Sequence, residues 1–150
     1  MDNLLELGYT NITVLDISTN AINKVKERLG TNADKVKWII SDITEFIPTE
    51  QYDIWHDRAV FHFLTQQKDI EYYKVLANEN ISANGYFILA TFADNGPDKC
   101  SGLFVNKYSK DNQVVQFKDS FTTVDSFNHE HTTPFGTTQN FTFSVFKKRK

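Results

Sequence analysis

A short apolar run that ends on a carboxylate is the feature that most constrains the fold of this chain. Residues 11–16 are rich in Ile, Val and Leu and end on Asp16, and a helical pattern opens among Ser18, Thr19 and Asn20. Such a run predicts a strand buried on both faces, with its acid at the carboxyl end, where open α/β sheets bind ligands. An aspartate that caps the helix or shapes a turn is an equally good interpretation of Asp16 taken alone.

The same pattern repeats further along the chain. A second predicted strand, 36–40, is followed by Ser41 and Asp42, and a helical pattern that ends at Gly30 separates it from the first strand. Two parallel strands that are joined by a helix have neighbouring carboxyl ends. We therefore expect Asp16 and Asp42 to flank one crevice.

The densest polar cluster follows a third predicted strand, 52–55. This strand runs into His56, Asp57 and Arg58. The next six residues predict a short helix or a turn that carries His62 back toward the strand end, and His62 is predicted to be a half-buried packing residue. Three successive strands thus end in polar groups at one edge of the sheet.

The remaining periodic patterns complete an α/β domain. Helices are predicted at the end of 1–8, closed by Gly8, at 66–78 with Thr65 as the cap, and, with a loop as the alternative, within 103–117. Strands are predicted at 86–92 after a tight Asn84-Gly85 turn, and at 121–131 and 139–147 on either side of a turn at 133–136. The sequence therefore predicts a Rossmann-like, doubly wound, mostly parallel sheet with an antiparallel C-terminal hairpin.

Composition narrows the class of protein. The 150 residues, 40% of them hydrophobic, predict one soluble globular domain over 1–150. A net charge of −3, with 147–150 as the only basic run, argues against nucleic-acid binding. The one cysteine, Cys100, excludes an intrachain disulfide, and the lack of an apolar leader or membrane-spanning stretch predicts a cytoplasmic protein without a membrane partner.

Two other kinds of site are weakly indicated. His129 and His131 alternate on a predicted strand and share a face, so that one further ligand would complete a zinc site. No HExxH motif or cysteine pair supports a metal, and we predict none. Cys100 lies in a Gly-Pro-containing loop with only Lys99 to lower the pKa of its thiol, which makes a nucleophilic role the weaker alternative.

Over essentially its whole length the chain resembles the class I S-adenosylmethionine-dependent methyltransferases. The resemblance rests on the strands that end in Asp16 and Asp42, the motif Trp-His-Asp-Arg-Ala-Val-Phe-His-Phe-Leu over 55–64, the run from Gly85 to Ala90, and the terminal hairpin with His131, Thr133, Pro134, Gly136 and Gln139. In that family the acid after the second strand binds ribose, and the acid after the third strand meets the adenine amino group. The resemblance implies S-adenosylmethionine as the cofactor, bound by Asp16, Ile17, Ser41, Asp42, Ile43 and His56.

The resemblance also implies the reaction, which is methyl transfer to an unidentified small-molecule or protein acceptor by in-line displacement, with S-adenosylhomocysteine as the product. The catalytic residues predicted in this way are His56, Asp57 and Arg58. His56 is the candidate base, because an imidazole can accept a proton near neutral pH. Asp57 either orients His56 or caps the following turn, and Arg58 either binds an acidic substrate group or joins a surface ion pair.

The chain departs from the family at its start. The family's first strand and glycine-rich loop have no counterpart, which predicts a domain that is incomplete at the N-terminus and a Met1 internal to a longer protein. The strand edges left unpaired predict a dimer or a partner chain. Two alternatives remain open: a non-catalytic remnant that serves as an interaction module, and a nicotinamide dehydrogenase, whose glycine fingerprint would lie in the absent region.

Overall fold

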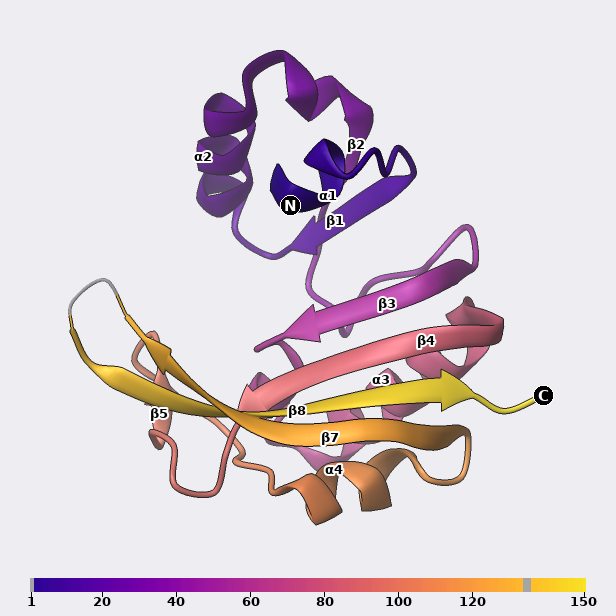
Figure 1. Cartoon of the computed structure of the whole chain (residues 1–150), viewed down its shortest axis with the longest axis vertical. Coiled ribbons are helices and arrows are strands. Elements are labelled where there is room, and N and C mark those ends of the chain that lie inside the picture. The colour runs from indigo at the N-terminus through magenta and orange to yellow at the C-terminus, as the bar shows by residue number, and fades with distance from the viewer. Residues whose placement is uncertain (1, 134–135) are drawn as a thin grey trace. The chain divides into compact units, whose positions relative to one another are not determined.

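The computed structural model describes residues 2–133 and 136–150 and divides into two compact units, Met1–Ile47 and Pro48–Lys150 (Figure 1). We call them the N-terminal and the C-terminal unit and describe each by itself. The predictions about Met1, and about Pro134 and Phe135 in the hairpin turn, lie outside the described residues.

The N-terminal unit contains a two-stranded parallel sheet and three helical segments. In chain order these are α1 (Asp2–Glu6), β1 (Ile12–Asp16), α2 (Thr19–Leu29), the 3-10 helix η1 (Gly30–Lys35) and β2 (Val36–Ile40). The predicted helix ends are confirmed. Ser18 Oγ accepts a hydrogen bond from the Ala21 amide, and Gly8 and Gly30 take the positive φ angles with which glycine closes a helix.

Strand β1 is less buried than its sequence predicts. All five of its residues are half-buried, so the prediction of a strand covered on both faces is wrong. Among the described residues β1 is hydrogen-bonded only to β2, and no strand precedes it. The buried hydrophobic residues described in this unit are Ile22, Ala33, Val36, Ile43 and Phe46.

The C-terminal unit is built on a four-stranded mixed sheet in the order β3-β4-β8-β7. Strands β3 (Tyr52–Arg58) and β4 (Ile81–Phe92) are parallel, and β7 (Phe121–Thr132) and β8 (Thr138–Lys148) form an antiparallel hairpin. The other elements are η2 (Phe61–Phe63), α3 (Gln67–Asn80), β5 (Lys99–Cys100), β6 (Leu103–Phe104) and α4 (Lys110–Phe117). The predicted α/β class, with parallel strands followed by an antiparallel C-terminal hairpin, is confirmed.

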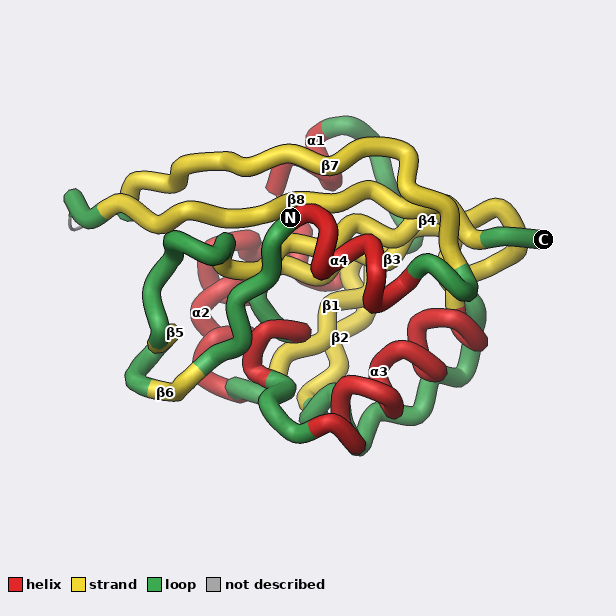
Figure 2. Tube along the Cα trace, turned by 90° about the horizontal axis from the view of Figure 1, so that it is seen from below, coloured by secondary structure: helices red, strands yellow, loops and turns green. Residues whose placement is uncertain are grey.

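Aromatic rings form the core of the C-terminal unit. Helices α3 and α4 lie on the same side of its sheet in both views (Figures 1 and 2). Phe87 of β4 lies between them and the sheet, with its ring centroid 5.0 to 6.3 Å from those of Tyr73, Phe117, Phe121 and Phe146. Aromatic pairs at these separations stabilise a core beyond the area that they bury.

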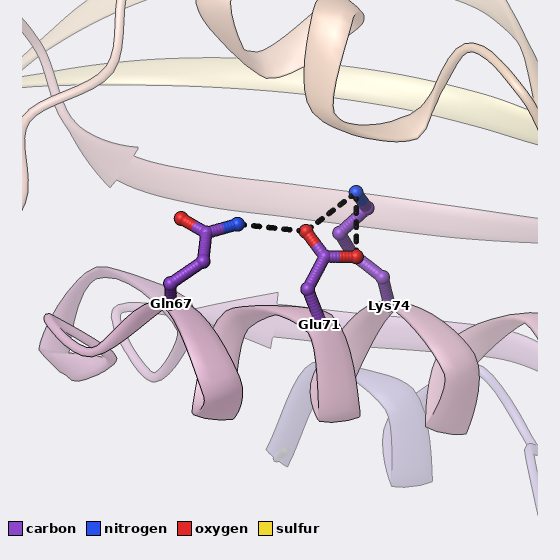
Figure 3. A network of polar contacts seen from close by, with 3 residues as sticks. All are labelled: Gln67, Glu71 and Lys74. Atoms are coloured by element: carbon purple, nitrogen blue, oxygen red, sulfur yellow. Dashed lines mark hydrogen bonds and ion pairs between the residues drawn. The ribbon is translucent and has the colours of Figure 1, made fainter.

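The outer surface of α3 carries a small polar network (Figure 3). Gln67 Nε2 donates to Glu71 Oε1 at 2.8 Å, and Lys74 Nζ lies 3.1 Å from the same carboxylate. Pairs one helical turn apart contribute only about 0.2–0.5 kcal/mol each. The predicted cap of this helix, Thr65, is wrong, because Gln66 holds the cap position and makes no side-chain hydrogen bond there.

Strand β4 differs most from its prediction. The predicted tight turn at Asn84-Gly85 is instead a bulge inside β4, which begins at Ile81 directly after α3. Asn84 takes a positive φ there, and a Cβ on Gly85 would lie 2.8 Å from Ile81 Cγ2. The Asn-Gly pair therefore supplies the backbone freedom that a bulge needs, which sequence alone does not distinguish from a turn.

The segment that was ambiguous between helix and loop contains both. The short β5–β6 hairpin was not predicted, and α4 begins after Ser109, whose Oγ accepts a hydrogen bond from the Asn112 amide.

In the described part of the chain, no helix is both long enough and apolar enough to cross a bilayer.

Candidate functional site

The polar ends of β1 and β2 lie side by side in the N-terminal unit. Asp16 pairs with Ile40, and the Ser41 amide donates to the Asp16 carbonyl at 3.2 Å. The backbone thus brings Asp42, two residues beyond Ile40, next to the end of β1. The predicted juxtaposition of Asp16 and Asp42 follows from the parallel pairing of the two strands.

Both carboxylates are held by their own neighbours in sequence. Asp16 Oδ1 accepts from the Ser18 amide at 2.7 Å, and Asp42 Oδ1 accepts from the amide and the hydroxyl of Thr44, each at 2.8 Å. The Oδ2 atom of each makes no hydrogen bond within the described residues. Each half-buried carboxylate therefore has a fixed orientation and one oxygen that can accept from a ligand hydroxyl or amine.

Three further predicted cofactor residues surround these acids. Ile17 is 66% exposed and offers an apolar surface beside Asp16. Ser41 Oγ donates to the Asp42 carbonyl at 2.9 Å and so helps to shape that turn. Ile43 is buried in the core of the N-terminal unit, where it anchors the segment after β2.

The predicted catalytic cluster lies at the carboxyl end of β3 in the C-terminal unit. His56 and Arg58 are exposed and Asp57 is buried, as the alternation of side chains along a strand requires. Asp57 therefore points away from His56. Its carboxylate accepts from the amides of Val60 at 2.8 Å and Phe61 at 3.0 Å, so that of its two predicted roles the structure shows the turn cap.

A tyrosine that the sequence did not single out completes this arrangement. Tyr73 of α3 donates its hydroxyl to Asp57 Oδ2 at 2.6 Å and accepts from Trp55 Nε1 at 3.2 Å. Burial raises the pKa of Asp57, against the lowering effect of its three hydrogen bonds, and it raises the pKa of Tyr73 well above its usual value. The sequence feature that could have indicated this bond is a tyrosine on the predicted inward face of the helix after the motif, because a buried hydroxyl needs a hydrogen-bond partner.

The side chains of the two exposed residues, His56 and Arg58, make no hydrogen bond within the described part of the chain. Partial burial, and next the positive charge of Arg58, lower the pKa of His56, which favours the neutral imidazole that a base requires. The Arg58 guanidinium lies 5.6 Å from the centroid of the Phe141 ring. No carboxylate pairs with Arg58 among the described residues, so the surface ion pair that was the alternative for this residue is not seen.

His62 lies deeper than predicted. Its side chain is fully buried rather than half-buried, and its Nδ1 accepts from the Phe92 amide at 3.3 Å. Burial lowers the pKa of His62 to about 4, and its buried Nε2 has no hydrogen-bond partner in the described part of the chain. His62 is therefore a neutral residue that joins η2 to the end of β4.

The weaker alternatives gain no support from the geometry. Residues 2–133 and 136–150 contain no group of three His, Cys, Asp or Glu side chains that could hold a metal ion. His129 and His131 instead contact the rings of Phe143 and Phe141. Cys100 packs against the buried hydrophobic cluster of Ala90, Phe92 and Phe141.

Comparison with known proteins identifies the relatives of this chain. The family model described as "Nodulation protein S (NodS)" matches residues 2–90, which is more than half of the chain. Malonyl-[acyl-carrier protein] O-methyltransferase 2 of Ilyobacter polytropus is 31% identical over 61 residues, or 41% of this chain and 23% of that protein. The match thus spans about a quarter of this curated relative.

Solved methyltransferase structures share the fold. The N-methyltransferase NodS from Bradyrhizobium japonicum WM9, in complex with S-adenosylhomocysteine, aligns with a TM-score of 0.72 at 13% identity, covering 93% of this chain and 67% of that one. The 1,6-didemethyltoxoflavin-N1-methyltransferase of Burkholderia thailandensis, with its acceptor and S-adenosylhomocysteine bound, gives 0.75 at 16%, covering 99% and 65%. These comparisons establish the class I methyltransferase fold and favour it over a nicotinamide dehydrogenase.

Proposed function

Because this chain belongs to the nodulation protein S (NodS) family, we propose that it transfers a methyl group from S-adenosylmethionine to a small-molecule or protein acceptor. One observation carries the proposal. The parallel strands β1 and β2 end in two oriented carboxylates, each with an oxygen left for a ligand. Ribose hydroxyls and an adenine amino group are hydrogen-bond donors, so this pair of acceptors fits the nucleoside part of the cofactor.

In this proposal the N-terminal unit supplies the binding groups. Asp16 accepts from the ribose, Asp42 accepts from the adenine amino group, and Ile17 provides apolar surface near the base. Ser41 shapes the turn that carries Asp42, and the buried Ile43 anchors that turn to the core of the unit. Bound S-adenosylmethionine would supply an electrophilic methyl group for in-line displacement. The residues of the chain then contribute alignment rather than covalent chemistry.

The C-terminal unit supplies the groups for the acceptor. His56 takes a proton from the nucleophile when the nucleophile starts protonated, and its lowered pKa supports this role. Arg58 carries a positive charge with no protein carboxylate beside it among the described residues, which suits an acidic group on the acceptor. Asp57 acts on the shape of the turn and not on the reacting atoms.

The finer assignments are also proposals. The relative from Burkholderia thailandensis has a small-molecule acceptor bound, which supports an acceptor of that class here. We propose a cytoplasmic protein without a nucleic-acid or membrane partner, and a dimer formed through open strand edges. The second candidate function is a non-catalytic module of the same fold, favoured by β1, whose only strand partner among the described residues is β2 and which therefore has an edge that a partner chain could pair with.

Calorimetric titration with S-adenosylhomocysteine tests the proposal. We expect micromolar binding to the wild-type chain and a loss of at least tenfold in affinity for both Asp16→Ala and Asp42→Ala. Asp34→Ala is the matched control, because this exposed aspartate of η1 lies outside the proposed binding groups. Absence of binding, together with a stable oligomer, supports the non-catalytic module instead.

A further inference from the structure

The turn after β3 contains a strained residue. Ala59 has a φ of 71°, in the left-handed region that a side chain disfavours. Its amide still donates to the Ala90 carbonyl of β4 at 2.9 Å, while the next two amides turn toward Asp57. A strained conformation persists only where the surrounding structure holds it, so something must hold this turn.

The Asp57 carboxylate is the group in direct contact with the turn. Each of its oxygens accepts from one backbone amide, those of Val60 and Phe61. The carboxylate is only 4% exposed, and no cation pairs with it among the described residues. Its one remaining hydrogen bond is the 2.6 Å bond from the Tyr73 hydroxyl, which lies on another element, α3.

Tyr73 is fixed independently of that hydrogen bond. Its ring centroid lies 6.3 Å from that of Phe87 and 6.5 Å from that of Phe117, neither of which belongs to the turn, and its side chain is 1% exposed. Packing therefore sets the position of the hydroxyl before Asp57 meets it. Core packing thus positions Tyr73, Tyr73 orients Asp57, and Asp57 holds the turn that directly follows Arg58.

We propose that Tyr73 is a positioning residue of the methyl-transfer site: its hydroxyl orients Asp57, which holds the strained turn at Ala59 and thereby sets the direction of Arg58 beside His56. The link from Arg58 to methyl transfer rests on the proposed function. The links from Tyr73 to Arg58 do not, and they can be measured on the chain without any ligand.

The test is an NMR titration of the His56 ring in Tyr73→Phe, which keeps the ring and removes only the hydroxyl. Arg58 is one cause of the lowered pKa of His56, so a displaced Arg58 lets that pKa rise toward 6.5. We also expect the Val60 and Phe61 amides to exchange with solvent at least tenfold faster. Tyr108→Phe is the matched control: this buried hydroxyl meets Asn106 and not Asp57, so both readouts should stay at wild-type values.

A rescue separates positioning from general stabilisation. Glycine takes a positive φ without strain, so adding Ala59→Gly to Tyr73→Phe should return the His56 titration and the slow amide exchange toward wild type. A folded Tyr73→Phe with unchanged titration and exchange overturns the proposal. A double variant that is unfolded also overturns it, and so does a double variant whose His56 titration and amide exchange equal those of Tyr73→Phe. Absence of S-adenosylhomocysteine binding would contradict the proposed function but would leave these ligand-free results intact.

Discussion

The two units of this chain hold the carboxylates of their predicted site residues in opposite ways. In the N-terminal unit, the carboxylates of Asp16 and Asp42 are bonded, among the described residues, only to groups two positions away in sequence, and both residues remain half-buried. In the C-terminal unit, Asp57 is buried and bonded to a helix 16 residues further along the chain. A carboxylate that is bonded only locally keeps an oxygen that can bind a ligand. A carboxylate that is also bonded to a distant helix uses both oxygens to stabilise the backbone turn.

The backbone follows the same division. Both described positive-φ residues of the N-terminal unit are glycines, Gly8 and Gly30, whereas the C-terminal unit also uses Ala59, Asn84 and Ser101 in that conformation. Of the buried hydrophobic residues in the described part of the chain, the C-terminal unit contributes 17 and the N-terminal unit contributes 5. A larger core can hold strain and a buried charge that a small one cannot.

The largest expected difference is in the cores. Leu89→Ala in the C-terminal unit and Ile22→Ala in the N-terminal unit remove side chains of the same size that are 0% and 2% exposed. We expect the first to lower the free energy of unfolding by about 4–5 kcal/mol and the second by about 2 kcal/mol, because a thin core relaxes around the cavity. Urea denaturation measures both, and equal losses would break the comparison.

The second largest difference is expected between the stability losses on removing a carboxylate from each unit. Asp57→Ala leaves the half-buried Val60 amide, the buried Phe61 amide and a buried hydroxyl without an acceptor, and we expect it to cost about 3 kcal/mol of stability. Asp16→Ala releases only the exposed Ser18 amide and should cost about 0.5–1 kcal/mol while weakening ligand binding. Denaturation midpoints of the two variants measure both losses. A greater loss in Asp16→Ala than in Asp57→Ala would contradict the assignment of roles.

Lowering the pH should reduce the stability of the fold mainly through groups of the C-terminal unit. The unfolded chain protonates His62 near pH 6.5, but the folded chain does so only near pH 4, so stability present above pH 6.5 is lost as the pH falls through this window. The slope is at most about 1.4 kcal/mol per pH unit for one proton. The lowered pKa of His56 acts in the same direction, and the raised pKa of Asp57 opposes it.

Unfolding midpoints of wild type and His62→Gln, measured between pH 7 and pH 4, check this prediction. The variant should lose most of the slope, and His131→Gln should keep it, because His131 lies only partly buried on the hairpin. A wild-type slope that survives in His62→Gln would place the titrating group elsewhere.

The smallest effect is a gain in stability at the strained turn. Ala59→Gly removes the left-handed strain, and after the entropic cost of glycine we expect a net gain of about 1 kcal/mol. Ala83→Gly, at an exposed position in the same unit without a positive φ, should instead lose about 0.4–1 kcal/mol. Thermal denaturation of the two variants should therefore shift in opposite directions, and a loss in Ala59→Gly would mean that the turn is not strained.

Local features of this chain were predictable from its sequence, and contacts between distant segments were not. The adjacency of Asp16 and Asp42 depends on strand periodicity and a helix crossover, which are local signals, and it was predicted. The capping role of Asp57 was one of two readings, because the choice depends on which face of β3 is buried. Helical periodicity places Tyr73 on the inward face of its helix but does not identify Asp57 as its partner. That hydrogen bond, the bulge at Asn84-Gly85 and the full burial of His62 depend on contacts between distant segments.

The most direct test of the central claim is an amide NMR titration of the chain with S-adenosylhomocysteine. If the carboxyl ends of β1 and β2 bind the nucleoside, the largest shift changes will fall on Ile17, Ser18, Ser41 and Thr44, and they will vanish in Asp16→Ala. Shift changes of equal size elsewhere, with these four amides unmoved at saturation, would show that the two oriented carboxylates are not the cofactor site.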